Sequence, residues 1–234
     1  MNGFASLLTR AVGRKALMAI SGIVLFGFVL VHMVGNLKLY QGRYADGVHA
    51  GQWKIDVYGE GLRELGAPVL GHGQALWIAR LVLLACVLLH IASAWAVTRQ
   101  SRAARPVAYQ VRVHVQSSYA VRTMRWGGVI IALFVAWHLA DLTLGWVHPS
   151  FVAGGVHANL VASFQRPAVA GLYIVANLAL GLHLFHGLWS LFQTLGWNNP
   201  KFNHWRRSFA TAFAGLVTAG NLSFPLAVLM GWVK

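Results

Sequence analysis

Four histidines of this chain lie inside long apolar stretches, where a polar side chain is costly. They are His32, His90, His138 and His183, and each falls in a different stretch. Polar groups inside a lipid bilayer are rare, and those that occur usually have a function. A fifth histidine, His186, follows His183 by about one helical turn. The helices around these imidazoles decide which chemistry they can carry out.

The composition is that of a polytopic membrane protein. The chain has 234 residues, of which 57% are hydrophobic and 10% are charged, whereas a soluble domain is usually about 25% charged. Five stretches approach or exceed the roughly 20 residues that a helix needs to cross the hydrocarbon core: 16–38, 74–98, 123–147, 168–193 and 208–232. Because lipid offers bare backbone groups no partner, each stretch is predicted to be helical. We expect one all-α membrane domain over residues 1–234.

Basic residues are unevenly distributed between the two ends of these spans. The formal net charge is +14, which on a soluble protein would suggest nucleic-acid binding. Because Lys and Arg here sit between apolar stretches, the charge instead indicates membrane topology, since loops rich in Lys and Arg stay cytoplasmic. We predict that the N-terminus is inside and the C-terminus outside. Twelve basic residues then face inward: Arg10, Arg14, Lys15, Arg99, Arg102, Arg105, Arg112, Arg122, Arg125, Lys201, Arg206 and Arg207.

The four histidines sort into two levels across the membrane. At a rise of about 1.5 Å per residue, His32 and His138 lie toward the outer ends of their spans, and His90 and His183 toward the inner ends. The two levels are separated by roughly 10 to 15 Å. His186 fits the inner level as well as His183 does.

Two imidazoles at one level can hold a haem iron from both faces, because neutral imidazole nitrogen is a good axial ligand. Helical bundles hold cofactors between facing helices in this way, whereas zinc requires three or four ligands at one point. The spacing therefore predicts two bis-histidine b haems in a bundle of the first four helices, carrying electrons rather than binding oxygen. The single cysteine, Cys86, excludes an internal disulfide and a four-cysteine iron–sulfur site.

Two charges also lie within the spans, at the level of the outer histidines. Arg80 and Asp141 each need a partner at this depth. We expect either an Arg80–Asp141 ion pair, with Arg80 alternatively holding a haem propionate, or a quinone site in which Asp141 carries protons. Further candidates for contacts with the inner haem's propionates are Arg14, Lys15, Ser21 and His186, and His186 is also a candidate quinone contact.

Two segments resemble a known family. "GRKALMAISGIVLFGFVLVHMVGNLKLY" (13–40) and "GLHLFHGLWSLFQTLGW" (181–197) are similar to the cytochrome b that anchors succinate dehydrogenase and fumarate reductase in the membrane. The resemblance is to the single-chain, five-helix, two-haem branch. It implies that the haem ligands are His32, His90, His138 and His183, and it selects His183 over His186. Some members carry a glutamate two residues before the fourth ligand, where this chain has Gly181.

The resemblance also implies partners and an electron route. A flavoprotein subunit with covalent FAD and an iron–sulfur subunit would dock on the cytoplasmic face of a prokaryotic cell membrane, and the complex could assemble into a higher oligomer. Electrons from succinate would pass through the inner and then the outer haem to a quinone, usually menaquinone, or in reverse during fumarate reduction.

Two other functions fit parts of the pattern. A dihaem subunit of a membrane hydrogenase or formate dehydrogenase would place its catalytic partner on the outer face, opposite the basic surface. A haem-free transporter would need an ion path, for which Arg80 and Asp141 are too few.

Overall fold

The computed structural model describes residues 10–104, 116–197 and 199–234, without the side chains of residues 116–122 and 202. Arg105, Arg112 and the side chain of Arg122 therefore lie outside the described residues. Within the described part the chain is helical, and its β structure is limited to two isolated bridges. The elements are α2 (Ala11–Asn36), η1 (Leu37–Gln41), α3 (Lys54–Gly61), α4 (Gln74–Ala103), α5 (Gln116–Leu142), α6 (Val156–Phe164), α7 (Pro167–Thr194), η2 (Pro200–Phe202) and α8 (Asn203–Leu229).

Five segments of the described chain are long and apolar enough to cross a membrane, which confirms the predicted all-helical fold with five spans. They are Ala11–Gln41, Gln74–Ala103, Thr123–Leu142, Pro167–Thr194 and Asn203–Leu229. The third span was expected to continue to residue 147 but its helix ends at Leu142. It ends there because the amide of Leu144 bonds back to the Leu139 carbonyl and Gly145 takes a left-handed φ of 70°, a common way to terminate a helix.

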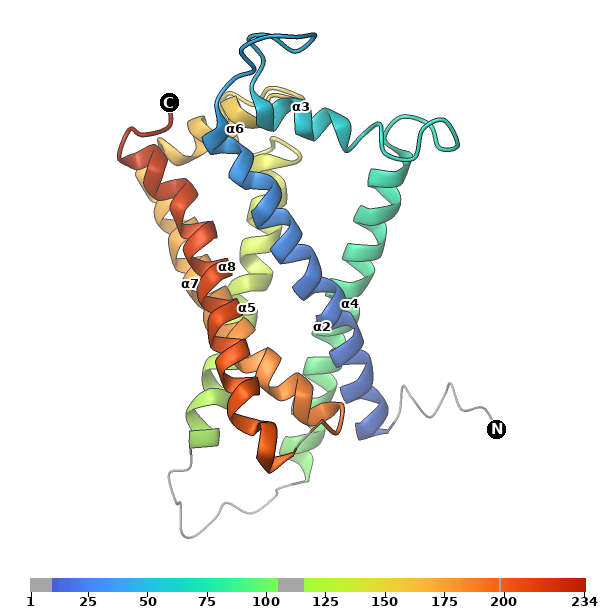
Figure 1. The fold of residues 1–234 in the computed structure, drawn as a ribbon. Coiled ribbons are helices and arrows are strands. Elements are labelled where there is room, and N and C mark those ends of the chain that lie inside the picture. The colour runs from blue at the N-terminus through green and yellow to red at the C-terminus, as the bar shows by residue number, and fades with distance from the viewer. Residues whose placement is uncertain (1–9, 105–115, 198) are drawn as a thin grey trace.

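The spans pack mainly as neighbouring antiparallel helices. α2 lies along α4, α5 lies along α7, and α7 lies along α8 (Figure 1). Side chains of α7 and α8 form a buried cluster that includes Leu184, Phe213 and Val217. α2 therefore pairs with α4, and α5 pairs with α7. His32 on α2 must meet His138 on α5 across the space between these two helix pairs. The same holds for His90 on α4 and His183 on α7.

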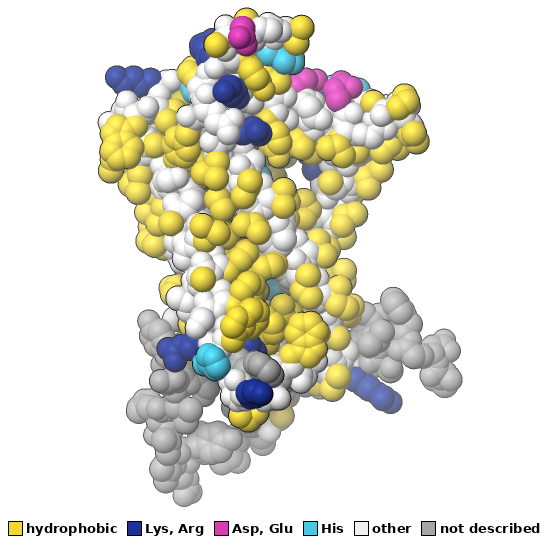
Figure 2. Space-filling model, viewed as in Figure 1, with side chains coloured by type: hydrophobic (Ala, Val, Ile, Leu, Met, Phe, Trp, Pro, Cys, Tyr) yellow, Lys and Arg dark blue, Asp and Glu magenta, His cyan; other side chains and the backbone are white. Residues whose placement is uncertain are grey.

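The two ends of the bundle differ in structure and charge. At one end, here called the capped end, the short helices α3 and α6 lie across the ends of the spans (Figure 1). Figure 2 shows acidic side chains at this end and an apolar band below it. The opposite end, here called the basic end, carries the described basic residues that the sequence assigned to the inner side: Arg10, Arg14, Lys15, Arg99, Arg102, Arg125, Lys201, Arg206 and Arg207.

An aromatic stack holds the cap together. The rings of Trp53 and His157 are parallel within 4° with centroids 3.5 Å apart, and the Arg43 guanidinium lies 4.2 Å from the ring centre of Trp53. The backbone amide of His157 donates to the Asp56 carboxylate at 2.7 Å. Burial lowers the pKa of His157 below its ordinary value. The connection between α2 and α4 is thereby fixed to α6.

The turn after α5 provides a test of the cap. Gly145 and Gly154 both have a positive φ, of 70° and 82°, but a Cβ on Gly145 would lie 2.5 Å from the Phe151 ring, whereas one on Gly154 meets nothing within 4 Å. We expect Gly154→Ala to cost about 1 kcal/mol of backbone strain and Gly145→Ala roughly 1–3 kcal/mol more from overpacking. Thermal denaturation in detergent measures both, and equal losses would contradict the described packing of Phe151.

Candidate functional site

One histidine pair lies near the capped end. His32 lies four residues before the end of α2, and His138 four residues before the end of α5. Their ring centroids are 5.8 Å apart and the rings are nearly perpendicular, at 87°. Phe28 and Phe134 lie beside the two imidazoles, with centroid distances of 5.2 and 5.7 Å. The structure thus brings together the two histidines that the sequence placed at the outer level.

The second pair lies toward the basic end. The ring centroids of His90 on α4 and His183 on α7 are 6.2 Å apart, with an interplanar angle of 67°. His90 Nδ1 donates to the Met18 carbonyl at 3.1 Å, and Ser21 Oγ lies 3.4 Å from the same nitrogen. Ser21 gives its single proton to the Leu17 carbonyl at 2.7 Å. The predicted contact of Ser21 with a haem propionate stays a prediction.

The separation of the ring centres in both pairs fits a metal held between two imidazoles. A bond from imidazole nitrogen to a metal is about 2 Å long, and a ring nitrogen lies roughly 1 Å from its ring centre, so two axial ligands place their ring centres about 6 Å apart. His90 carries its proton on Nδ1, as its bond to the Met18 carbonyl requires. Its Nε2 then keeps the lone pair that a metal ligand needs. These imidazole donors are suited to ligate haem iron, and haem ligation stays a prediction.

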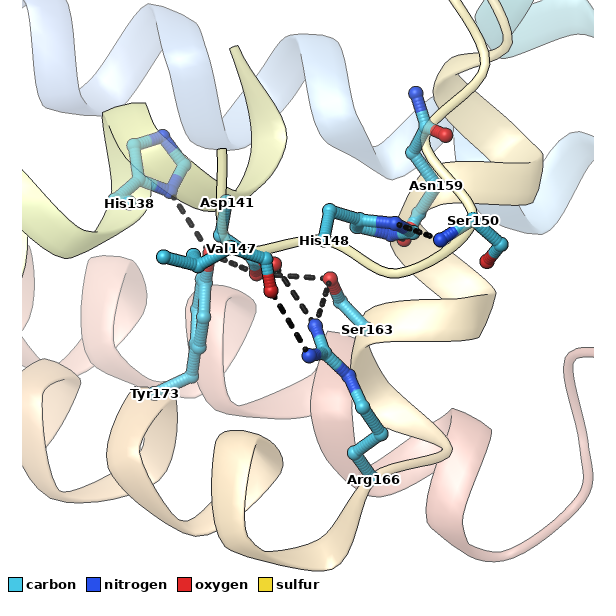
Figure 3. Close-up of polar contacts among 9 residues, drawn as sticks. All are labelled: His138, Asp141, Val147, His148, Ser150, Asn159, Ser163, Arg166 and Tyr173. Carbon is cyan, nitrogen blue, oxygen red and sulfur yellow. Dashed lines mark hydrogen bonds and ion pairs between the residues drawn. The ribbon is translucent and has the colours of Figure 1, made fainter. Parts of the chain in front are cut away.

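A buried carboxylate joins three helices beside His138. Asp141 has no exposed surface, and three side chains converge on it (Figure 3). Arg166 and Ser163 each donate to it at 2.8 Å, Arg166 to Oδ1 and Ser163 to Oδ2, and Tyr173 donates to Oδ2 at 3.1 Å. The Tyr173 oxygen also lies 3.4 Å from His138 Nδ1. Asp141 is thus connected to one of the paired imidazoles through a single hydroxyl.

The predicted Arg80–Asp141 ion pair is wrong. Asp141 pairs with Arg166 at 2.8 Å, while Arg80 lies with its guanidinium 5.0 Å from the Trp77 ring centre. The physical reason is packing: α4, which carries Arg80, lies along α2, and α5, which carries Asp141, lies along α7 and contacts α6. The predicted role of Asp141 as a proton carrier at a quinone site stays a prediction.

The junction between α6 and α7 positions the partners of Asp141. Ser163 lies in the last turn of α6 and Arg166 is the residue before α7, with an extended backbone. Pro167 opens α7, where its missing N–H costs nothing and where it forces the preceding residue out of helical geometry. This break turns the Arg166 side chain back toward Asp141, where it also donates to the Val147 carbonyl at 3.3 Å.

The loop before α6 is held by two polar side chains. Asn159 donates to the Val152 carbonyl and accepts from its amide, both at 2.8 Å. The Ser150 amide donates to His148 Nδ1 at 3.2 Å, so His148 Nε2 carries the proton and donates to the Asn159 carbonyl at 2.9 Å. These bonds fix the loop that contributes the Val147 carbonyl to Arg166 (Figure 3).

The remaining candidates lie at separate places. Arg14 and Lys15 lie in the first turns of α2 at the basic end, and His186 lies on α7 with its ring 5.0 Å from the ring of Phe185. Their propionate and quinone contacts remain predictions. Gly181 packs against α8, and a Cβ there would collide with the Thr218 hydroxyl. A glutamate side chain at position 181 would therefore not fit without a shift of Thr218 on α8, because α7 and α8 pack closely there.

Sequence reasoning missed the roles of Tyr173, Ser163 and Arg166. The sequence separation between Tyr173 and His183 could have indicated that Tyr173 lies at the level of the other histidine pair. Tyr173 precedes His183 by ten residues, which is about 15 Å along a helix and matches the separation of the two histidine levels. No comparable signal identifies Ser163, because its role depends on how α6 folds back over α5.

Fold and site together define a multi-pass helical membrane protein with two pairs of facing imidazoles. A family model for the transmembrane subunit of succinate dehydrogenase and fumarate reductase matches residues 98–222, which is a little more than half of the chain. The chain belongs to this family. The match includes His138 and His183 and leaves His32 and His90 outside it. Searches of curated proteins and of solved structures each give no significant match.

The ion pair between Asp141 and Arg166 is expected to contribute to the free energy of unfolding. Removing one partner of a buried ion pair costs about 3–5 kcal/mol because the remaining charge is uncompensated. We expect Arg166→Met to lower the midpoint of thermal unfolding strongly, and the double variant Arg166→Met/Asp141→Asn to recover much of that loss. Arg80→Met is the control, with a small effect. A larger effect from Arg80 than from Arg166 would restore the ion pair that the sequence suggested.

Proposed function

We propose that this chain is the membrane anchor and electron-transfer subunit of a succinate:quinone oxidoreductase in a prokaryotic cell membrane. It holds two b haems, one between His32 and His138 and one between His90 and His183. Electrons pass from the iron–sulfur subunit through both haems to a quinone, with menaquinone the expected species, or in reverse during fumarate reduction. The observation that carries the proposal is the pair of facing imidazoles at each of two levels in a chain of this family.

The two levels support electron transfer across the membrane. Tyr173, which contacts His138, and His183 lie on the same helix, ten residues or about 15 Å apart. The haems would supply one-electron chemistry, and this chain's residues would fix their positions and exclude water. Each iron would have both axial positions filled, so neither haem is expected to bind oxygen. Arg80, Arg14 and Lys15 are the candidate partners of the haem propionates.

The basic end is the proposed docking surface for the soluble partners. Members of this family associate with a flavoprotein subunit and an iron–sulfur subunit, which in this complex would carry FAD and the iron–sulfur clusters and hold the succinate site. Basic loops stay cytoplasmic, so the basic end is assigned to the cytoplasm. Figure 2 shows acidic side chains at the capped end, where Asp46, Asp56, Glu60 and Glu64 lie on α3 or in the segments next to it.

The alternatives are weaker on specific grounds. A hydrogenase or formate dehydrogenase subunit would share the dihaem arrangement, but the family match is to the succinate dehydrogenase and fumarate reductase subunit. A haem-free transporter does not explain why the imidazoles meet in pairs at a separation that suits a metal.

Haem content tests the ligand assignment. We expect the purified complex to show two b haems per chain in its pyridine haemochrome spectrum, both reduced by succinate. His90→Ala and His183→Ala should each remove the same single haem, because each deletes one axial ligand of the basic-end pair.

His186→Ala is the matched control, one turn along the same helix, and it should keep both haems. Loss of a haem in His186→Ala with retention in His183→Ala would move the ligand to His186. Complete absence of haem from the unmodified complex would leave the transporter as the better assignment.

Charge reversal tests the docking surface. Arg102 and Arg207 are exposed at the basic end, so Arg102→Glu/Arg207→Glu should release the soluble subunits from membranes at lower salt than the unmodified chain does. Lys54→Glu/Lys234→Glu, at the capped end, is the control and should leave release unchanged. Release by the control pair alone would reverse the proposed orientation. The measurement is the membrane-bound fraction of the partner subunits over a salt series.

A further inference from the structure

Tyr173 lies between the buried carboxylate and one of the paired imidazoles. Its side chain is 4% exposed, and its ring packs against Phe134 and Phe164 with both centroid distances 4.9 Å. Its hydroxyl lies 3.1 Å from Asp141 Oδ2 and 3.4 Å from His138 Nδ1 (Figure 3). The two ring contacts and the two polar contacts of the hydroxyl together hold the Tyr173 side chain at this position.

The direction of these hydrogen bonds follows from the donor inventory. An ionised carboxylate only accepts, and Asp141 is paired with Arg166. Tyr173 therefore gives its proton to Asp141, and its oxygen lone pair faces His138. His138 must then carry its proton on Nδ1 and donate it to Tyr173, which leaves Nε2 deprotonated. The result is a chain of donors from the imidazole through the hydroxyl to a carboxylate.

Among the described residues, His90 of the other pair has no such connection to a carboxylate. His90 Nδ1 faces the neutral Met18 carbonyl and the neutral Ser21 hydroxyl. A partner that accepts strongly from the outer N–H of a ligating histidine raises the basicity of that ligand, and hydrogen bonding around a haem ligand is one of the means by which a protein tunes the cofactor. A hydroxyl that is itself bound to a carboxylate accepts more strongly than a free one, because hydrogen bonds in a chain polarise one another.

We propose that Tyr173 is a positioning residue that transmits the negative charge of Asp141 to His138 and so lowers the midpoint potential of the haem at the capped end. The inference rests on the proposed function, since it requires a haem between His32 and His138. A more basic ligand stabilises ferric iron over ferrous iron, so the two haems are electronically unequal. Arg166 bonds to the opposite oxygen of Asp141, Oδ1, and balances the charge that Tyr173 transmits.

The test is a spectroelectrochemical titration of the purified complex carrying Tyr173→Phe. This change removes the hydroxyl and keeps the ring. We expect the reduced-to-oxidised ratio of the capped-end haem to rise about tenfold at a fixed potential, which is 59 mV for a one-electron couple. The potential of the other haem should not change. The capped-end haem is identified as the one that remains in His90→Ala.

Tyr40→Phe is the matched control. It also removes a tyrosine hydroxyl, one that donates to Ser223 at 2.8 Å, and it should leave both potentials unchanged. Asp141→Asn is the second variant, because it removes the charge and keeps the shape, and it should raise the same potential as Tyr173→Phe does. If Tyr173→Phe loses haem, the Asp141→Asn potential decides the inference.

The outcomes separate this inference from the function. An unchanged capped-end potential in a variant with full haem content, or equal shifts of both haems, overturns the role of Tyr173 and leaves the function intact. Absence of haem from the unmodified complex overturns the function itself. A rise confined to the capped-end haem supports the role.

Discussion

The capped end depends on one buried charge. Asp141 is fully enclosed in a segment that lies within the membrane span, and an isolated carboxylate there would be prohibitively costly. Three donors from three sequence positions remove that cost: Ser163 from α6, Arg166 from the junction before α7, and Tyr173 from α7. The break between α6 and α7, the short loop before α6 and the end of α5 are all arranged so that these groups meet.

The two imidazole pairs share a spacing but differ in surroundings. Both have ring centres about 6 Å apart, yet one pair is connected to a carboxylate and the other to a backbone carbonyl. Under the proposed function, the two haems would therefore differ in potential, because their axial ligands have different hydrogen-bond partners.

The two ends of the bundle differ in how they are covered and charged. The capped end is closed by α3 and α6 and by the stack of Trp53, His157 and Arg43, so the capped-end pair is covered by protein. The basic end carries exposed cations at the ends of the long helices, such as Lys15, Arg102 and Arg207, and no comparable cap among the described residues. The two ends thus differ in charge and, among the described residues, in how the spans are covered.

The sequence by itself determined the five spans, the helical fold and the levels of the four histidines, because each depends on local quantities: apolar length, the rise of a helix and the types of residues. It also indicated which end is basic. The tertiary structure decided which charges meet. Arg80 and Asp141 are level with each other, but depth does not say which helices are neighbours, and the packing of α4 on α2 separates them. Arg166 reaches Asp141 only because the chain folds back through α6, and Tyr173 joins them because α7 lies along α5. Side-chain partners across helices depend on which faces pack together, and a linear pattern does not contain that information.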